Sequence, residues 1–577
     1  MITLVSLGGA PVREWTHGAV HVVEATPSAI ASLWPALRGA VSTNAVLFWD
    51  RALGAAPAAE TLERLLGSGC DVMHAGLALG LTALPRALQY AHPSWMLGAV
   101  QSSDRACSSF RVTLRSCLVR QQVLDVMDGP SAAFDSLDGA ALEMGHRWLS
   151  GGVLLRFEPS LVTSRAAESV ASLPLDDELR FARVRYGRTW GRYAAFRAWR
   201  TGLGSLPEAM RSWSRIASQR SESVVRVMPR APLPPLETSN ASETVTVLIP
   251  TIERPAYLRT TLEHLRHQTH RPHQVIVVDQ TPIESRDMSY VEEFSDLPLV
   301  SIVLEQAGQC SSRNAGLARA TGKWVLFIDD DVDLPPDTIA RHLAVCARHG
   351  ADSCSGVAEE DGVPRLPLSQ QFVQISSVFN GNNTLARRSA LIDAGGFDLA
   401  YDRGIRADGD LGQRLHNAGR LLLLDGANSV FHHHAPRGGL RVHKARVVTR
   451  ATSKLSITGR HLLTPSEVYM TLRHFGERAL RELLWIRAMS SLTMSGSAAS
   501  RMMRGAVALL RMPGTLRRQA LAVDAGRSLL TRYPQFAAMP FTEPASGMMH
   551  GTLAGKMNVS ASAALFRAVT ASPEPGR

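Results

Sequence analysis

The sequence contains few cysteines and no paired cysteine motif. None of the six is spaced as CxxC, so we expect reduced, buried thiols instead of a disulfide framework or a zinc site. No window approaches the ~18 consecutive apolar residues that a membrane-spanning helix needs. The first residues, MITLVSLGGAPVREW, lack a basic leader before an apolar run, which argues against a secretory signal. These absences predict a cytoplasmic protein that is stabilised by hydrophobic packing.

The composition is that of a globular protein with an excess of positive charge. Of the 577 residues, 45% are hydrophobic and 20% are charged, and the formal net charge is +11. A chain of this length needs about two to four domains. The charge indicates an anionic partner: nucleic acid, a membrane surface or a phosphorylated substrate. A nucleic-acid partner is not expected, because no zinc-finger spacing, helix-turn-helix pattern or stacking-aromatic motif is present. A basic nucleic-acid-binding protein stays an alternative.

A Pro- and Ser-rich linker, MPRAPLPPLETSNASE (228–243), marks a domain boundary. After it, predicted strands (VTVLIP, QVIVVD, KWVLFID) alternate with helices. The segment RPAYLRTTLEHLRHQ places Leu258, Leu262 and Leu265 on one helical stripe, with Pro255 in the first turn. This alternation predicts a parallel α/β sheet that is covered by helices on both faces. Ligands of such sheets bind beyond the carboxyl ends of the strands.

Polar residues stand at the ends of the three predicted strands. They are Thr251 and Glu253, then Asp279, then Asp329, Asp330 and Asp331. Adjacent carboxylates raise one another's pKa unless a cation or several donors compensate. An Asp-rich turn that caps the next helix is the alternative, but a turn needs one aspartate, not three. The shared placement at strand ends therefore favours a metal site.

Two further polar clusters follow in the same region. In RADGDLGQRLHNAG, Asp408 and Asp410 begin a predicted helix. Since the helix dipole favours carboxylates there, N-capping is the alternative to a catalytic role. The segment NSVFHHHAPRGG ends a predicted strand on His432, His433 and His434. In an extended segment the first and third of these face the same side, and three histidines after two acidic clusters indicate a metal or anion site.

This ordered set of motifs resembles the family 2 glycosyltransferases, which are inverting, metal-dependent enzymes of the GT-A fold that use nucleotide-sugars. The resemblance covers about residues 245–439. It rests on PTIERP, VVDQT, GQCSSRNAGL, VLFIDDDVDLPPD, NNTLARRSALIDAGGFD, ADGDLGQRL and the histidine cluster. The implied fold class is α/β, a GT-A domain of the Rossmann-like nucleotide-diphospho-sugar transferase type.

The resemblance also implies a role for each cluster. The implied nucleotide-sugar contacts are Pro250, Thr251, Glu253, Asp279, Arg313, Asp329 and Asp330. The implied ligands of a Mn²⁺ or Mg²⁺ ion are Asp331, Asp329, His432 and His434, with Asp329 and Asp331 as the DxD pair. Asp408 matches the catalytic base, and the implied acceptor-side residues are Asn382, Asn383 and Asp410. The glutamate that usually precedes the base is Ala407 here, which departs from the family pattern.

The chemistry agrees with these roles. A departing nucleoside diphosphate needs a cation, and an attacking hydroxyl needs a carboxylate that takes its proton. We therefore expect inverting transfer of a sugar from a nucleotide-sugar donor to a hydroxyl of a glycan, lipid-linked or small-molecule acceptor. A nucleotidyltransferase that makes nucleotide-sugars is the rival enzyme. PTIERPAYL contains no glycine, however, whereas that class has a Gly-rich loop after the first strand.

The N-terminal region is interpreted as a degenerate copy of the same domain. NAVLFWDRALG aligns with KWVLFIDDDVD, so that Asp50 takes the place of the first DxD aspartate and Ala52 that of Asp331. ALEMGHRWLSGG aligns with DGDLGQRLHNAG, with Ala141 in the place of Asp408, and TLRSCL resembles TLARRSAL. Chance similarity between two α/β segments is the alternative. Since this copy lacks the base and the histidine cluster, we expect it to support the fold or bind acceptor.

The sequence thus predicts four regions. They are a degenerate glycosyltransferase-like domain (1–163), a helical segment with the linker (164–243), a catalytic GT-A domain (244–445) and a basic helical region with a disordered tail (446–577). In the last region Arg is mixed with Met, Leu and Trp. A packed helical cap is the favoured interpretation. The alternative is peripheral contact with the inner face of a membrane that holds a lipid-linked acceptor.

Overall fold

The computed structural model describes most of the chain up to residue 533. The described residues are 1–40, 43–75, 105–162, 173–218, 226–233, 242–362, 365–367, 371–376, 379–435, 462–490 and 497–533. The chain divides into a compact unit, Met1–Met539, and a second unit, Pro540–Arg577, which lies outside the described residues together with the predicted disordered tail. All six cysteines are buried free thiols, as their spacing predicts.

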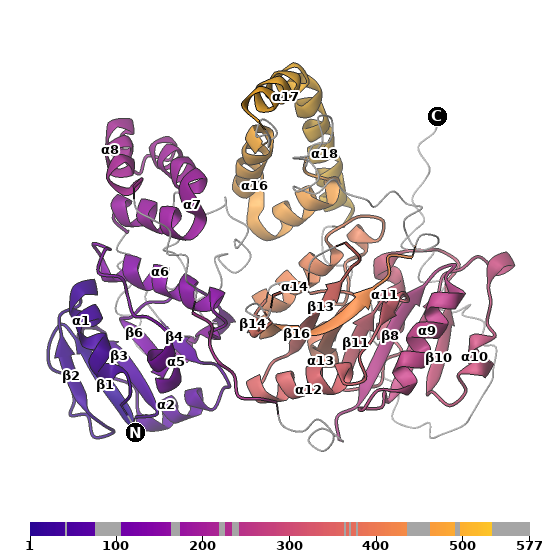
Figure 1. Ribbon diagram of the computed structural model, residues 1–577, viewed down its shortest axis with the longest axis horizontal. Helices are drawn as coiled ribbons and strands as arrows, with labels where there is room; N and C mark the ends of the chain where they lie inside the picture. The colour runs from indigo at the N-terminus through magenta and orange to yellow at the C-terminus, as the bar shows by residue number, and fades with distance from the viewer. Residues whose placement is uncertain are drawn as a thin grey trace. The chain divides into compact units, whose positions relative to one another are not determined.

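The larger sheet carries the predicted alternation of strands and helices (Figure 1). Its order is β10-β9-β8-β11-β15-β13-β16-β12, and β14 pairs with β16. The strands are β8 (Val245–Thr251), β9 (Gln274–Asp279), β10 (Leu299–Val303), β11 (Trp324–Ile328), β12 (Val332–Asp333), β13 (Ser353–Glu359), β14 (Val373–Ile375), β15 (Asn383–Arg387) and β16 (Leu422–His432). From β10 to β11 neighbours are parallel, but β15 is antiparallel to β11 and β13. The sheet is therefore mixed and not wholly parallel, because no described helix between β13 and β15 supplies a crossover.

Helices follow the strands of this sheet where the sequence predicts them. They are α9 (Pro255–Arg266), α10 (Tyr290–Glu293), α11 (Gln309–Leu317), α12 (Thr338–His349), α13 (Arg388–Asp393) and α14 (Ala407–Asn417). Helix α9 begins at Pro255, where a missing N–H costs nothing. Its Leu258, Leu262 and Leu265 are buried, which confirms the predicted stripe. All of β11 is buried, so the strand delivers Asp329 from the hydrophobic core to the sheet edge.

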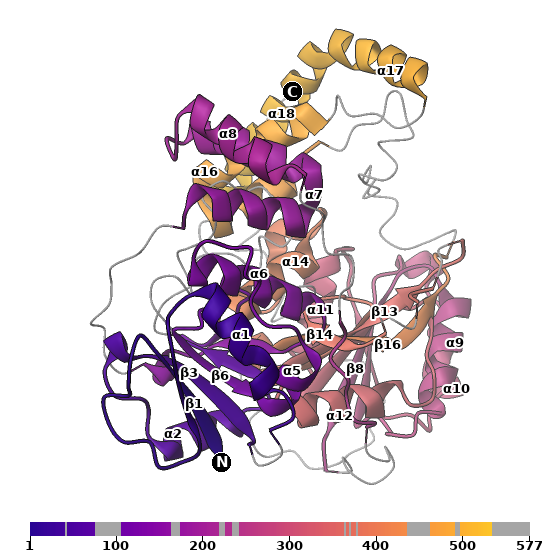
Figure 2. The ribbon, with the colours of Figure 1, turned by 60° about the vertical axis from the view of Figure 1, so that its left-hand side comes forward.

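The smaller sheet, in the N-terminal region, repeats the strand order of the larger one. Its strands are β1 (Ile2–Leu7), β2 (Val20–Val23), β3 (Ala45–Asp50), β4 (Val72–His74), β5 (Cys107–Ser108), β6 (Ser116–Arg120) and β7 (Leu155–Phe157). Their order is β2-β1-β3-β6-β4-β7-β5, with β6 antiparallel to β3 and β4. Figure 2 labels β1, β3 and β6 of this sheet. The larger sheet has β9-β8-β11-β15-β13-β16, with β14 beside β16 as β5 lies beside β7. Order and strand directions therefore agree.

The registers of the two sheets correct one predicted match. Leu118 lies opposite Leu47 in the smaller sheet, as Leu385 lies opposite Leu326 in the larger. Cys117 therefore corresponds to Thr384, so the proposed match of TLRSCL with TLARRSAL is wrong. A shared Thr-Leu dipeptide suggested that match, but the pairing of the strands fixes which residues are equivalent. By the same register Arg115 precedes β6 as Asn382 precedes β15.

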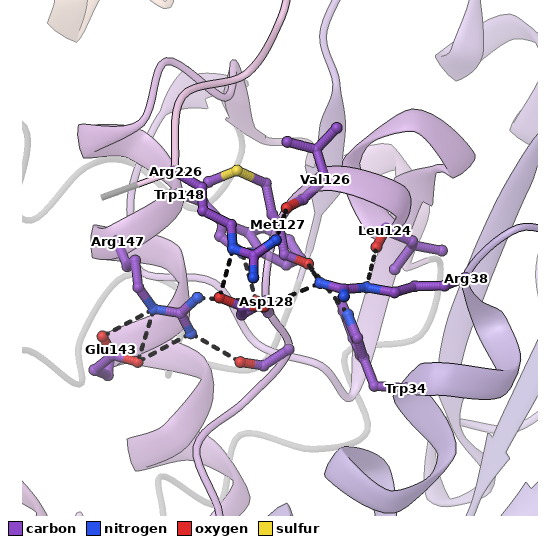
Figure 3. Close-up of polar contacts among 11 residues, drawn as sticks. Trp34, Arg38, Leu124, Val126, Met127, Asp128, Glu143, Arg147, Trp148 and Arg226 are labelled. Carbon is purple, nitrogen blue, oxygen red and sulfur yellow. Dashed lines mark hydrogen bonds and ion pairs between the residues drawn. The ribbon is translucent and has the colours of Figure 1, made fainter. Parts of the chain in front are cut away.

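In the N-terminal region, helices pack beside the smaller sheet. They are α1 (Pro27–Leu37), α2 (Ala59–Leu66), α5 (Gln121–Val126), α6 (Leu137–Ser150), α7 (Leu175–Arg200) and α8 (Leu206–Ile216). The segment after α5 is held by arginines from separate elements (Figure 3). Arg38 donates to the Met127 carbonyl and to Asp128, Arg147 donates to the Asp128 carbonyl, and Arg226 forms an ion pair with Asp128. These contacts satisfy carbonyls that the end of a short helix leaves unpaired.

Each of the two sheet regions is followed by a kinked helix that contacts the last helix of that region. Helix α7 breaks at Gly187 (φ 85°) and α16 (Pro465–Ser490) at Gly476 (φ 78°), a backbone conformation that favours glycine. Arg185 of α7 forms an ion pair with Glu143 of α6. His474 of α16 likewise contacts Asp410 of α14. The likeness of the two regions therefore extends beyond their sheets.

The C-terminal region is helical, as predicted. After α16 come α17 (Ala498–Leu510) and α18 (Met512–Arg532). Among the residues that the structure describes, we find no helix whose length and apolar character would let it cross a membrane.

Candidate active site

The carboxyl ends of β8 and β9 meet at one edge of the larger sheet. Thr251 lies opposite Asp279 in the parallel register. Asp279 is buried, and its Oδ1 accepts a hydrogen bond from Thr281 N at 2.8 Å. The chain turns after β8 at Glu253, whose φ of 55° is uncommon for a residue with a side chain. Its N–H donates to Thr281 Oγ1 at 2.9 Å, and its side chain is exposed beside the half-buried Pro250. The two strand ends are thereby joined into one rim.

Asp330 is enclosed by protein groups at this rim. Its Oδ2 accepts from Thr251 Oγ1 at 2.6 Å and its Oδ1 accepts from Arg254 Nη1 at 2.9 Å. Burial raises the pKa of Asp330 to about 6, although Arg254 and Thr251 act in the opposite direction. Both oxygens, and the Thr251 hydroxyl, are used within the protein. Asp330 therefore links β8 to β11 through both of its oxygens.

Asp331 lies where β12 pairs with β16. Its Oδ2 accepts from Ala435 N at 2.8 Å and lies 3.1 Å from Arg254 Nη1. Its Oδ1 is buried and lies 3.2 Å from His432 Nε2, an ion-pair contact without the geometry of a well-aligned hydrogen bond. Burial acts to raise the pKa of Asp331, but His432, the Ala435 N–H and Arg254 hold it at about 2. An ionised carboxylate is thus held in the interior, and His432 is the group that lies beside its Oδ1.

The groups around this oxygen suit a divalent cation. Asp329, Asp331 and His432 each bring one ligand atom within 4.8 Å of the others. Two carboxylates and one imidazole match Mn²⁺, and Mg²⁺ accepts the oxygens. A cation at this point would satisfy the buried Asp331 Oδ1. The residues present therefore fit the group.

The other histidines lie apart from this set. The His432 and His434 rings share one side of the chain, with centroids 4.0 Å apart. His434 Nε2 lies 2.8 Å from Glu360 Oε1, and Glu360, His432 and His434 form a second group whose ligand atoms lie within 4.8 Å of one another, with His432 common to both groups. His433 instead faces Asp333, with 2.9 Å between Nε2 and Oδ2. The structure thus places His432 beside Asp331 and His434 beside Glu360.

Asp408 faces the same site from the first turn of α14. Arg313 Nη2 donates to Asp329 Oδ1 at 3.1 Å. A Cβ atom at Gly381 would lie 3.0 Å from Asp408 Oδ1 and 3.2 Å from Arg313 Nη2, so all three side chains border one small space. Burial raises the pKa of Asp408; Arg313 opposes this effect and Asp329 adds to it. A carboxylate with a raised pKa, beside a cationic group, is suited to accept a proton.

The residues expected on the acceptor side are not brought together. Asn382 is half-buried, with its Oδ1 unpaired. Asn383 is buried in the core, where it contacts His342 and donates to the Asn428 carbonyl. Asp410 is also buried, in a network that joins α14 to α16. Of the three, only Asn382 has a side-chain oxygen without a hydrogen-bond partner, and that oxygen is itself buried.

Two residues that the sequence analysis missed hold the site together. Arg254 contacts both Asp330 and Asp331. Asp402 covers the first turn of α11, because its Oδ1 accepts from Cys310 N and Ser311 N at 2.8 Å each. This cap fixes the helix that carries Arg313. Arg254 could have been found from the sequence, because it lies in PTIERP directly after Glu253. Asp402 could not, because its role depends on a contact with α11, which is distant in the chain.

A comparison with known families agrees with this geometry. Residues 246–406 match the model of glycosyl transferase family 2. They contain the rim of β8 and β9, Arg313 and the three adjacent aspartates. This region is a family 2 glycosyltransferase domain. It has the GT-A fold, and the match ends two residues before Asp408, so the place of that residue depends on the geometry described above.

Three similar proteins illustrate the relationship. The chain is 32% identical over 102 residues to an uncharacterized glycosyltransferase of Haemophilus influenzae, over 18% of this chain and 34% of that one. It is 23% identical over 266 residues to the O-antigen biosynthesis protein RfbC of Myxococcus xanthus, over 41% and 20%. The solved structure of the mannosyltransferase PcManGT from Pyrobaculum calidifontis, in complex with GDP-Man and Mn²⁺, is 19% identical with a TM-score of 0.35, over 63% and 100%. The chain therefore spans about a third or less of its first two relatives' lengths.

The smaller sheet has a different group at the corresponding edge. Asp50 ends β3 as Asp329 follows β11, but Arg115 Nη1 donates to Asp50 Oδ2 at 2.6 Å. Arg115 Nε also lies 3.3 Å from both oxygens of Asp138, which is in the first turn of α6. Both carboxylates are largely buried. At the corresponding edge of the glycosyltransferase domain, Asp329 belongs to the group that fits a divalent cation. At this edge of the smaller sheet, the Arg115 guanidinium contacts Asp50 and Asp138 instead.

Proposed function

We propose that this chain transfers a sugar from a nucleotide-sugar donor to a hydroxyl acceptor, with inversion, and that a divalent cation is required. The observation that carries the proposal is the convergence of Asp329, Asp331 and His432 beside Arg313 and Asp408. The buried Asp331 oxygen beside His432, the guanidinium groups of Arg254 and Arg313, and the Asp408 carboxylate with its raised pKa border one site. Each of these matches one need of the reaction.

The cation would be held by Asp331, Asp329 and His432. Mn²⁺ or Mg²⁺ supplies charge that stabilises the departing diphosphate. Arg313 lies against Asp329 and offers a fixed positive charge on the same side. The rim formed by Pro250, Glu253 and Asp279 would receive the nucleoside. We assign Asp330 and Asn383 structural roles, because their polar atoms are bonded within the protein.

Asp408 would act as the general base. The acceptor hydroxyl oxygen forms a bond to the anomeric carbon, the bond from that carbon to the diphosphate oxygen breaks, and the hydroxyl proton passes to Asp408. Attack on the face opposite the leaving group inverts the anomeric centre. Burial and Asp329 raise the pKa of Asp408, which improves the acceptance of a proton, while Arg313 keeps the ionised form accessible.

The acceptor is proposed to be a growing polysaccharide. The relative from Myxococcus xanthus is named for O-antigen biosynthesis, and the match to it covers 41% of this chain. A glycan chain, free or lipid-linked, presents the hydroxyl that the base would deprotonate.

We further propose that the N-terminal region is a degenerate copy without a second active site. The common strand order and the equivalent kinked helices support the duplication. Ala52 and Ala141 replace the ligand and the base, and Arg115 fills the remaining acidic site. Calorimetric titration of the full chain carrying Asp331→Ala, with Mn²⁺ and nucleotide-sugars, should detect no binding. Metal-dependent binding in that variant would instead reveal a second site.

The function is tested by screening nucleotide-sugars for hydrolysis and for transfer to oligosaccharides, with Mn²⁺, with Mg²⁺ and with EDTA. We expect activity with one donor class, its loss in EDTA, and an inverted anomeric configuration by NMR. Undiminished activity in EDTA, or retention of configuration, would contradict the proposal.

A further inference from the structure

The pairing of the strands matches individual residues of the two sheet regions. β7 pairs with β4 and β5 as β16 pairs with β13 and β14. Since β4 and β13 are themselves matched through β6 and β15, Leu155 at the start of β7 corresponds to Leu422 at the start of β16. Gly152 and Gly419 each stand three residues before these positions, and their φ angles are 83° and 80°. The two glycines are therefore equivalent.

These two glycines make the same contact, each with the other region. A Cβ atom at Gly152 would lie 3.1 Å from the carbonyl oxygen of Val373, the first residue of β14. A Cβ atom at Gly419 would lie 2.6 Å from the carbonyl oxygen of Ala106, just before β5. Ala106 and Val373 are also equivalent, because each comes directly before the residue that pairs with the third residue of β7 or of β16. One contact is thus made twice, with the roles of the two regions exchanged.

The turns before β4 and β13 show the same exchange. Gly69 and Gly350 each stand three residues before the first residue of these strands, with φ angles of 76° and 60°. A Cβ atom at Gly69 would lie 2.7 Å from the His349 carbonyl oxygen. A Cβ atom at Gly350 would lie 3.5 Å from the Ser68 carbonyl oxygen. Since His349 precedes Gly350 as Ser68 precedes Gly69, these contacts are a second reciprocal pair.

The kinked helices α7 and α16 meet at equivalent residues. The Tyr193 hydroxyl donates a hydrogen bond to Glu482 Oε1. Tyr193 lies six residues after the kink at Gly187, and Glu482 lies six residues after the kink at Gly476. A residue that contacts its own equivalent lies on a twofold axis, and pairs of exchanged contacts lie on either side of that axis. The three sets of contacts therefore describe one twofold relation.

This relation is the one that defines an isologous interface between two subunits. In such an interface residue i contacts residue j and the equivalent of j contacts the equivalent of i. Repeats that stack head to tail, as in solenoid proteins, place two different surfaces in contact instead. An isologous interface also closes on itself, so that it joins two copies and no more.

We propose that the N-terminal region is an internal partner subunit, which covers one surface of the glycosyltransferase domain as the second subunit of a twofold homodimer would. This pairing surface consists of His349, Gly350, Val373 and Gly419. The inference rests on the duplication proposed above and not on the chemistry of the active site. Because both copies belong to one chain, the pairing surface is occupied within the chain, and the full-length protein is a monomer.

The pairing surface adjoins a segment of the active site. From β14 the chain continues to Gly381, which borders Asp408 and Arg313. Gly152 approaches β14 at its first residue, Val373. The N-terminal region thus supports the strand from which this segment starts, which gives a copy without catalytic groups a role in the enzyme.

The test places the photoreactive residue p-benzoylphenylalanine at two equivalent positions of the full chain, Phe372 and Arg105. A Cβ atom at Gly152 would lie 2.7 Å from the Phe372 ring, and one at Gly419 would lie 3.5 Å from Arg105 Cγ. We expect each position to cross-link, within one chain, to the segment around its glycine, as located by peptide mass spectrometry. Ile283, which is 77% exposed, is the control position and should give no link to the N-terminal region. Sedimentation velocity should give the mass of one chain.

A second measurement uses hydrogen exchange and needs no photoreactive residue. Gly152→Ala should raise the amide exchange rates of β14 by roughly tenfold or more, because a clash at this contact lowers the free energy of local opening. Gly419→Ala should do the same for β5. Gly202→Ala is the matched control, since Gly202 has a similar φ of 75° but no atom near its Cβ position. It carries the backbone strain without the contact.

The outcomes separate this inference from the proposed function. Cross-links between two chains, with the mass of a dimer, would overturn it, because a second chain would then occupy the pairing surface. Only one of the two links, neither of them, or equal exchange rates in Gly152→Ala and Gly202→Ala would overturn it as well. Asp331→Ala should lose turnover and keep both cross-links. A wild type that formed both links without any transferase activity would contradict the proposed function alone.

Discussion

Arg115 and Asp50 form an ion pair of 2.6 Å between Nη1 and Oδ2 at the end of β3. At the equivalent edge of the glycosyltransferase domain, Asp329 lies in the group that fits a divalent cation. Two carboxylates, Asp50 and Asp138, approach each other in the N-terminal region without such a group, and the guanidinium compensates both. Burial raises the pKa of Asp138, Arg115 lowers it, and Asp50 raises it further. A fixed internal guanidinium thus compensates the carboxylates at the edge that corresponds to the one where we propose an exchangeable cation.

This relationship predicts the effect of Arg115→Met on stability. Removal of the guanidinium leaves two largely buried carboxylates uncompensated. We expect the free energy of unfolding to fall by about 1–3 kcal/mol, less than the ~3–5 of a fully enclosed pair, because the Arg115 side chain is 26% exposed. Urea denaturation measures the change. Arg226→Met is the control: its ion pair with Asp128 (Figure 3) joins two side chains that are each about half exposed, so a loss of stability below ~1 kcal/mol is expected. Equal losses in the two variants would contradict the compensation argument.

The second prediction concerns the cation ligand. Asp331→Ala removes the buried oxygen and should reduce donor turnover by at least ~100-fold, since the cation supplies several kcal/mol of charge stabilisation. Asp333→Asn is the matched control in the same acidic run. Its side chain is half-buried and contacts His433, outside the proposed ligand group. We expect that variant to keep most of its activity. The measurement is the steady-state rate of each variant at varied Mn²⁺ concentration. A similar loss of activity in both variants would show that Asp331 is not the cation ligand.

Much of this site was predictable, because strand ends collect polar residues at one edge of a sheet. The triple aspartate, Asp408 and the histidines all lie near that edge. The sequence did not show which protein group compensates the negative charge of the three aspartates. Arg254, 76 residues from Asp330 in the chain, neutralises part of that charge. The three carboxylates are therefore tolerated through arginine as well as through the proposed cation.

Asp410 shows where a closer interpretation of the sequence would have helped. Helical residues turn by about 100° per position, so Asp408 and Asp410 face nearly opposite directions. One borders the site, and the other contacts Arg414 and His474 in the interior. Burial in that place acts to raise the pKa of Asp410, but Arg414 and His474 lower it below its ordinary value. The residue thus stabilises the fold.

The third prediction follows for Asp410→Asn. This change should lower the free energy of unfolding by about 3–5 kcal/mol at neutral pH, the usual cost of breaking a buried ion pair. Since the folded pKa is depressed, the stabilisation is present above the unfolded pKa and is lost as pH falls through the folded pKa. The difference between wild type and variant in urea denaturation should therefore shrink below about pH 4. A difference that grows at acid pH would contradict the ion-pair assignment.

The fourth prediction concerns the space beside Gly381. Alanine there would bring a Cβ within 3.0 Å of Asp408 Oδ1 and 3.2 Å of Arg313 Nη2, so both groups must shift. A displacement of this kind should lower kcat by roughly 10–100-fold, with little change in the urea midpoint. Gly505→Ala is the control, because no atom lies near its Cβ position. Normal kinetics in Gly381→Ala would show that the two side chains do not need their present positions.

The last prediction separates the base from the donor site. Asp408→Asn keeps the size of the side chain but removes its ability to take a proton. Turnover should fall by roughly 10²–10⁴-fold, the range for loss of a general base. Donor affinity, measured by calorimetry with Mn²⁺, should stay nearly unchanged, because the proposed ligands Asp329, Asp331 and His432 remain in place. Comparison with Asp410→Asn removes the effect of stability, since that variant disturbs the same helix without touching the site. If donor affinity collapses in Asp408→Asn while turnover at saturating donor stays normal, Asp408 is a donor contact and the base lies elsewhere.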